Sequence, residues 1–63
     1  MSAVKTYICN GRTKLTVKEI KPGVDELTVF ELMGDRWVQL GPPEWWTRSA
    51  SLEVIEAWEE GAV

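Results

Sequence analysis

The sequence predicts a small α+β domain, in which two hairpins form an antiparallel sheet or partly open barrel of four or five strands beside one C-terminal helix. Two stretches rich in strand-forming residues each contain a dipeptide typical of a tight hairpin loop. The last stretch has its apolar residues at helical spacing. With 63 residues, the chain has room for a single domain spanning 1–63 and for one small core.

The first hairpin is predicted from the stretch KTYICNGRTKLTVKEI, because Asn10-Gly11 favours a two-residue type I′ loop. This loop places Cys9 opposite Arg12 and Tyr7 opposite Lys14. The predicted inner face carries Val4, Thr6, Ile8, Thr13, Leu15 and Val17. The predicted outer face carries Lys5, Tyr7, Cys9, Arg12, Lys14, Thr16 and Lys18. Turn chemistry and hydrophobic pattern agree on this register, and the segment 21–23, KPG, ends the hairpin.

The second hairpin is predicted from ELTVFELMGDRWVQLG, in which Gly34-Asp35 suits a type II′ loop with glycine first. That loop pairs Met33 with Arg36 and Phe30 with Gln39. One face then carries Leu27, Val29, Glu31, Met33, Arg36, Val38 and Leu40. The other face carries Thr28, Phe30, Leu32, Trp37 and Gln39. Because both faces are partly apolar, this hairpin needs cover on both sides.

The final stretch, SASLEVIEAWEEGAV, predicts a helix. Ser49 or Ser51 serves as its N-cap, and Gly61 stops it. Glu53 lies in the first turn, where a negative charge suits the helix dipole. The predicted apolar stripe consists of Leu52, Val54, Ile55 and Trp58.

Two adjacent tryptophans follow a double proline in the segment 41–46, GPPEWW. Prolines favour an extended path, so a short fifth strand is expected around residues 44–47. Neighbouring side chains of an extended segment point to opposite faces. We therefore expect one of Trp45 and Trp46 to seal the core near Trp58 and the other to face outward, and strand parity alone does not say which.

No pattern in the sequence indicates catalysis. The chain has no histidine and one cysteine, which removes the usual zinc ligands and any intramolecular disulfide. It lacks a glycine-rich phosphate loop and a nucleophile with an adjacent base. It also has no apolar run that could span a membrane, and residues 1–10 lack the apolar core of a signal peptide. We expect a cytoplasmic protein that is not an enzyme, with no catalytic residue, metal ligand, cofactor or membrane partner.

Charge is unevenly distributed along the chain. The net charge is −3, but residues 1–24 carry +4 and residues 25–63 carry −7. The basic residues of the first hairpin, together with one aromatic residue, predict an alternative face for an anion or single-stranded nucleic acid. That face consists of Lys5, Tyr7, Arg12, Lys14 and Lys18. The acidic net charge disfavours this reading.

The order of elements, with the opening VKTYICNGRTKLTVKEIK, resembles the small Src-homology-type barrels that end in a helix, as in chromodomains and small archaeal chromatin proteins. In the archaeal proteins an aromatic sheet face contacts the DNA minor groove, and the resemblance places Phe30, Leu32 and Trp37 there. Residues 25–63 depart from the basic character of those proteins, so DNA binding is not expected to carry over. Chromodomains bind methylated lysine in an aromatic cage. The rings available here are Tyr7, Trp37, Trp45 and Trp46.

The function that the sequence favours is non-enzymatic binding to, or regulation of, another protein through an aromatic-rich surface. Tryptophan and arginine are enriched at the energetic centres of protein interfaces. The residues expected at this surface are Phe30, Trp37, Trp45, Trp46 and Arg48. The partner is expected to be another protein or a second copy in a homodimer. Small size, acidity and the lack of catalytic residues also suit a virus-encoded inhibitor of a host protein.

Overall fold

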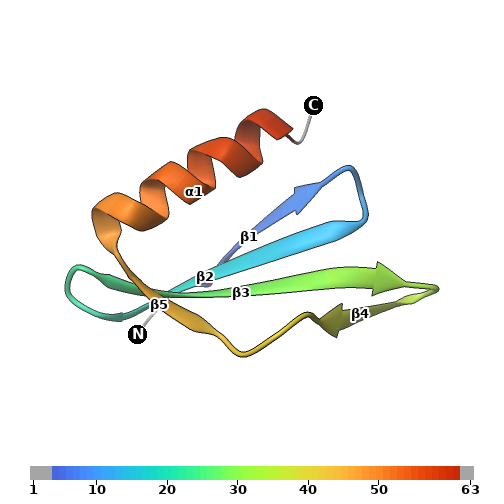
Figure 1. The fold of residues 1–63 in the computed structure, drawn as a ribbon, viewed down its shortest axis with the longest axis horizontal. Coiled ribbons are helices and arrows are strands. Elements are labelled where there is room, and N and C mark those ends of the chain that lie inside the picture. Colours follow the sequence, from blue (N-terminus) through green and yellow to red (C-terminus); the bar gives the residue numbers. More distant parts are fainter. Residues whose placement is uncertain (1–3, 62–63) are drawn as a thin grey trace.

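The computed structural model describes residues 4–61, which form one five-stranded antiparallel sheet with a single helix on one side (Figure 1). The strands are β1 (Val4–Cys9), β2 (Thr13–Lys21), β3 (Val24–Met33), β4 (Arg36–Gln39) and β5 (Glu44–Thr47), and the helix is α1 (Arg48–Gly61). The predicted α+β fold class and the short fifth strand are confirmed. No helix in this part of the chain is long and apolar enough to cross a membrane.

The sheet is built around the long strand β3. Strand β2 pairs with one edge of β3, and β1 pairs with β2. On the other edge of β3, residues 24–27 pair with β5 and residues 30–33 pair with β4. Within residues 4–61 no pairing joins β1 to β4 or β5, so the sheet is open and does not close into a barrel.

The loop between β1 and β2 has the predicted turn but a different register. Asn10 and Gly11 have φ values of 54° and 67°, as a type I′ turn requires, and the Arg12 N–H donates to the Cys9 carbonyl at 3.1 Å. Cys9 nevertheless pairs with Thr13, so Arg12 is an extra residue of the loop. The predicted pairing of Cys9 with Arg12 is wrong by one residue.

This one-residue shift turns over the whole of β1, because successive strand residues point to opposite faces. Tyr7 now lies opposite Leu15 and packs against the core on the helix side. Val4 and Ile8, which were expected inside, are 56% and 48% exposed on the other side. The aromatic ring of Tyr7 offers the small core more apolar surface than the isoleucine side chain would.

The other two turns of the sheet fit the sequence well. Met33 pairs with Arg36 and Phe30 with Gln39, which confirms the predicted register of the β3–β4 hairpin. Gly34 between these strands has a φ of 67°, the left-handed value that the first position of a type II′ loop needs. Strands β2 and β3 meet at a turn in which Gly23 has a φ of 80°, and a bulge between Glu19 and Lys21 accompanies that turn.

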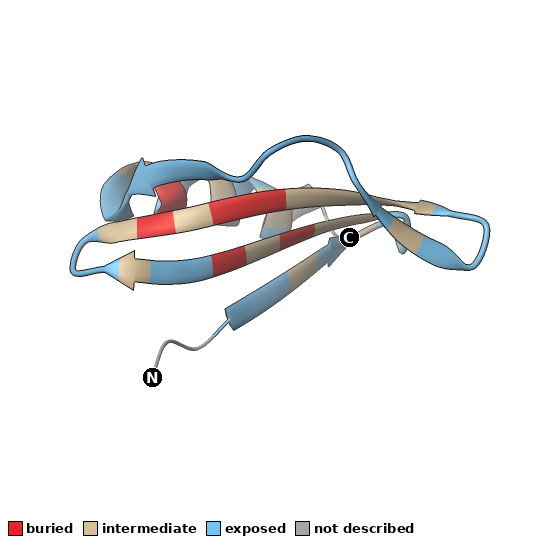
Figure 2. Ribbon diagram, turned by 90° about the horizontal axis from the view of Figure 1, so that it is seen from below, coloured by how far each residue is buried: buried red, intermediate tan, exposed pale blue. Residues whose placement is uncertain are grey.

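The core lies between α1 and the side of the sheet that faces it (Figures 1 and 2). Its buried apolar residues are Leu15, Val17 and Leu27. The partly buried residues packed against them are Tyr7, Val29, Val54, Ile55 and Trp58. The core is small, as expected for a chain of this length, and aromatic rings supply much of its surface.

The helix differs from its prediction at its start. It begins at Arg48, so Ser49 and Ser51 lie within its first turn and neither is the N-cap. Ser51 is fully buried, whereas Leu52 is 54% exposed. The inward stripe therefore consists of Ser51, Val54, Ile55 and Trp58. These four residues have the i, i+3, i+4, i+7 spacing of one helix face, and the predicted inclusion of Leu52 is wrong.

Alanine substitutions in β1 test the observed register. The Tyr7 ring packs against the core but is only partly buried, so we expect Tyr7→Ala to lower the free energy of unfolding by about 2–3 kcal/mol. Ile8→Ala should change it by less than about 1 kcal/mol, because that side chain faces solvent. Urea unfolding followed by tryptophan fluorescence measures both values. A larger loss for Ile8→Ala than for Tyr7→Ala would contradict the observed register.

Candidate functional site

The side of the sheet opposite α1 is the candidate functional site, and it is called the outer face below. Pairing partners share a face, so the strand registers define its members. They are Val4, Thr6, Ile8, Lys14, Thr16, Lys18, Glu26, Thr28, Phe30, Leu32, Trp37, Gln39 and Trp45. Figure 2 shows this side, with α1 behind the strands. In residues 4–61 no helix lies over the outer face (Figure 1).

Three rows of side chains cross the outer face from strand to strand. The first row consists of Val4, Lys18, Glu26 and Trp45. The middle row consists of Thr6, Thr16 and Thr28. The third row consists of Ile8, Lys14, Phe30 and Gln39, and Leu32 and Trp37 lie beyond it. Large apolar side chains and lysines thus occupy both ends of the face, and small hydroxyl side chains lie between them.

Trp45 is the most exposed large apolar residue at this end of the face. It is 67% exposed, and its indole Nε1–H donates to the Glu26 carboxylate at 3.1 Å. The hydrogen bond holds the ring in a defined position while its apolar surface stays in contact with water. The prediction that one of the two adjacent tryptophans faces outward is confirmed, and Trp45 is that residue.

Lys14 lies between two aromatic rings at the other end of the outer face. Its Nζ is 4.6 Å from the centroid of Phe30 and 4.8 Å from that of Trp37. Both distances are within the range of a cation–π interaction. The contact places a positive charge on the surface of an apolar cluster and restricts the motion of the lysine side chain.

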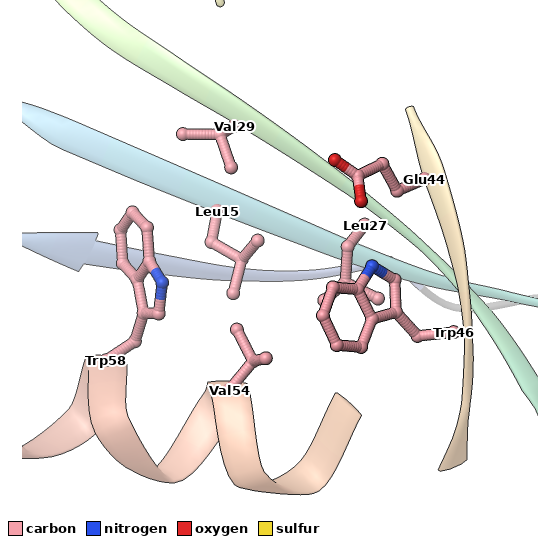
Figure 3. Close-up of a pocket in the computed structure, with 7 residues that line it drawn as sticks. All are labelled: Leu15, Leu27, Val29, Glu44, Trp46, Val54 and Trp58. Carbon is pink, nitrogen blue, oxygen red and sulfur yellow. The ribbon is translucent and has the colours of Figure 1, made fainter. Parts of the chain in front are cut away.

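Trp46 belongs to the opposite side of the sheet. It lines a cleft of about 100 Å³ between α1 and the strands (Figure 3). The cleft is lined by Leu15, Leu27, Val29, Glu44, Trp46, Val54 and Trp58. In Figure 3 Trp46 and Trp58 lie on either side of Val54. Trp46 lies on the helix side of the sheet but keeps 36% of its surface exposed, so it lines the edge of the core and does not seal it beside Trp58. It is not brought together with Trp45.

Arg48 is held at the start of α1 by the carboxylate of Asp25 on β3. Its Nε donates to Oδ2 at 2.8 Å and its Nη2 donates to Oδ1 at 2.9 Å, and Nη2 also donates to Glu19. Asp25 is only 2% exposed, and the buried hydroxyl of Ser51 donates to its Oδ2 at 2.5 Å. Arg48 thus serves the fold, and the structure does not place it on the outer face.

These contacts set the protonation of Asp25. The hydrogen bond from Arg48 holds the pKa of this carboxyl below its ordinary value of 3.8. The Ser51 hydrogen bond and the positive charges of Arg48 and Lys5 lower the pKa further, while burial opposes them.

The first turn of α1 contains no acidic residue, so the prediction that Glu53 lies in this turn is wrong. Asp25 provides the negative charge at the positive end of the helix instead.

The predicted basic face is divided by the register of β1. Lys5 and Tyr7 lie on the helix side, whereas Lys14 and Lys18 lie on the outer face. Arg12 lies in the loop, and its carbonyl accepts a hydrogen bond from Leu32 at 2.8 Å. These residues do not form one surface.

The rings considered for an aromatic cage are separated in the same way. Tyr7 and Trp46 lie on the helix side, and Trp37 and Trp45 lie at opposite ends of the outer face. The arrangement does not enclose a methylated lysine. In the described part of the chain, no group of three His, Cys, Asp or Glu residues is placed to hold a metal ion.

Sequence reasoning missed two residues of the outer face, Val4 and Ile8. A two-residue loop at Asn10-Gly11 places both in the core. The same turn also fits a loop with one extra residue, which reverses the two faces of β1. No local sequence signal separates the two loops, and the packing of Tyr7 against the core selects the observed register.

A scan against protein-family models, a search of curated proteins and a search of solved structures each found no match to this chain.

Alanine substitution of the paired tryptophans separates their roles in stability. We expect Trp46→Ala to lower the free energy of unfolding by about 2–3 kcal/mol, since the ring lines the cleft against α1. Trp45→Ala should cost less than about 1 kcal/mol, because the ring is exposed and loses one surface hydrogen bond. Thermal and urea unfolding of the two variants test this order. Equal losses would contradict the assignment of the two rings to opposite sides.

The lowered pKa of Asp25 makes part of the stability depend on pH. A carboxyl whose pKa is lowered by folding contributes stability that is present above its unfolded pKa and is lost as the pH falls through the lowered value. We therefore expect wild-type protein to lose this contribution as the pH falls below 3.8. Asp25→Asn should cost about 2 kcal/mol near neutral pH, because it removes the charge that Arg48 and Ser51 bind.

Urea unfolding at about pH 7 and about pH 3 measures the effect. Asp25→Asn should show a smaller loss of stability between these two conditions than wild type. Glu53→Gln, at an exposed position of α1, is the matched control and should keep the wild-type loss. The same acid-induced loss in Asp25→Asn and wild type would show that Asp25 does not carry this pH dependence.

Proposed function

We propose that this chain is a non-enzymatic module that binds another protein through the outer face of its sheet. The observation that carries the proposal is the 67% exposure of Trp45 on a sheet face over which no described helix lies. Tryptophan is among the residues that contribute most to protein–protein affinity. A ring held in place by the Glu26 carboxylate loses little conformational freedom when a partner covers it.

The other apolar residues of the outer face also support a binding surface. Val4 and Ile8 are 56% and 48% exposed, and Phe30 and Trp37 are partly exposed on the same face. Several large apolar side chains that share one exposed face are typical of an interaction site. The revised site keeps Phe30, Trp37 and Trp45 from the residues expected at the outset. It gains Val4 and Ile8, and it loses Trp46 and Arg48, which hold the helix on the sheet.

The separation of the two sides of the sheet also supports the proposal. The core and the Asp25 network lie between α1 and the inner side. The outer face can therefore be covered by a partner without any change in the fold. A small rigid domain of this kind regulates or inhibits a larger protein by occupying part of its surface.

The nucleic-acid alternative has less support. Its five residues are divided between the helix side, the loop and the outer face. A single-stranded nucleic acid needs a continuous row of positive charges along its backbone.

Replacing Trp45 by alanine tests the proposed function. Immobilised wild-type protein should capture a specific partner from a lysate of the native host, as identified by mass spectrometry. Trp45→Ala should fold normally by circular dichroism and lose about 2 kcal/mol or more of binding free energy in titration against that partner. Leu52→Ala is the matched control, since Leu52 is 54% exposed on the opposite side of the molecule. Loss of binding in the control but not in Trp45→Ala would contradict the proposal.

A further inference from the structure

We propose that the outer face selects an acidic segment of its partner, in which carboxylates alternate with large apolar side chains. This inference rests on the proposed function and adds the chemistry of the partner. It comes from where the charges of the outer face lie relative to its apolar side chains, and from the charge of the opposite side of the molecule.

The two sides of the molecule carry opposite charges. The described charged residues of the outer face are Lys14, Lys18 and Glu26. The exposed residues of α1 include Glu53, Glu56 and Glu59. An acidic partner is therefore attracted to the outer face and repelled by the helix, whereas a basic partner is drawn to the helix. Complementary charge of this kind determines which side of the domain is bound.

Each lysine of the outer face lies beside large apolar side chains. Lys14 lies between Ile8 and Phe30 in its row, and its Nζ contacts the rings of Phe30 and Trp37. A partner residue that reaches this ammonium group must lie next to an apolar cluster. Its neighbour on the partner is then best matched by an aliphatic or aromatic side chain.

The other end of the face places a lysine between an aliphatic side chain and an acid. Lys18 lies next to Val4, and Trp45 lies on the far side of Glu26. Glu26 accepts the indole hydrogen bond of Trp45, so this carboxylate already has a partner within the domain. The face therefore offers one ammonium group among apolar side chains and one between Val4 and the Glu26 carboxylate, and its two lysines outnumber its one acid.

The spacing of the two lysines sets the geometry of the partner. Lys14 and Lys18 are four residues apart on β2, which is roughly 13 Å along a strand. Carboxylates four residues apart on an extended peptide have the same spacing. The threonine row between the lysines consists of small side chains, so a partner backbone can pass over it.

A nucleic acid fits these features less well than an acidic peptide. Its phosphates carry a charge at every nucleotide, whereas this face offers two ammonium groups with a threonine row between them. Val4 and Ile8 provide aliphatic surface, which suits apolar side chains better than stacked bases. The net charge of −3 also repels a long polyanion more strongly than a short acidic peptide.

Selection from a random peptide library displayed on phage tests the inference. Wild-type protein is the bait, and Trp45→Ala is used to remove peptides that bind elsewhere. We expect the enriched peptides to carry a net negative charge, with acidic residues two positions away from leucine, isoleucine or aromatic residues, so that both kinds share one face of an extended peptide. A fluorescent synthetic copy of an enriched peptide is then titrated by anisotropy.

Matched variants define the expected result. The double variant Lys14→Gln/Lys18→Gln should bind the synthetic peptide about tenfold more weakly, and salt should weaken the wild-type complex. Glu56→Gln on α1 is the control and should bind as wild type does, because it lies on the opposite side. A control peptide carries glutamine in place of the acidic residues. Its affinity for wild-type protein should be about as low as the affinity of the acidic peptide for the double variant.

Other outcomes overturn the inference in distinguishable ways. Enriched peptides that are neutral or basic but still need Trp45 would refute the acidic partner and leave the proposed protein-binding function intact. An absence of any Trp45-dependent peptide would count against both. Tighter Trp45-dependent binding of a short oligo(dT) than of the peptide would favour nucleic acid. Concentration-dependent dimerisation of wild type, absent in Trp45→Ala by sedimentation, would identify a second copy as the occupant.

Discussion

The carboxylate of Asp25 is the group on which the arrangement of this small domain depends. It lies on the central strand with 2% of its surface exposed, and a buried negative charge is stable only when other groups bind it. Arg48 and Ser51 meet this requirement from the first turn of α1. The helix can therefore begin at one place on the sheet. Its inward stripe follows from the position of Ser51, which is why Leu52 is left exposed.

Fixing the helix on one side of the sheet leaves the other side uncovered. Because neighbouring strand residues point to opposite faces, one of the two adjacent tryptophans lies on the helix side and the other is exposed on the outer face. Trp46 lines the cleft on the helix side, and its neighbour Trp45 faces water beside Glu26. Substitution of Trp46 is therefore expected to lower stability, whereas substitution of Trp45 is expected to affect binding. The side that holds the fold together and the side available to a partner share a backbone but no side chains.

The same division separates the charges of the molecule. The acidic residues of α1 lie away from the lysines of the outer face, although the two sets belong to one small chain. Lys14 shows how charge and apolar surface combine there, because its ammonium group lies over the rings of Phe30 and Trp37. A surface that is apolar at both ends, with threonines between and more lysines than acids, can distinguish partners by charge as well as by shape.

Much of the fold could be predicted from local sequence. The turn at Gly34-Asp35 and the opposite orientations of Trp45 and Trp46 follow from glycine conformation and strand parity, which neighbouring residues determine. The candidate site was predicted in part, since Phe30, Trp37 and Trp45 do share a face.

Two features were decided by tertiary structure alone. The register of β1 was one of them, because Asn10-Gly11 adopts the same turn whether or not Arg12 is an extra loop residue. Only packing of Tyr7 against the core selects between the two registers. The binding of Asp25 by Arg48 was the other. These residues are 23 positions apart, and no local pattern indicates that a strand carboxylate will meet the start of the helix.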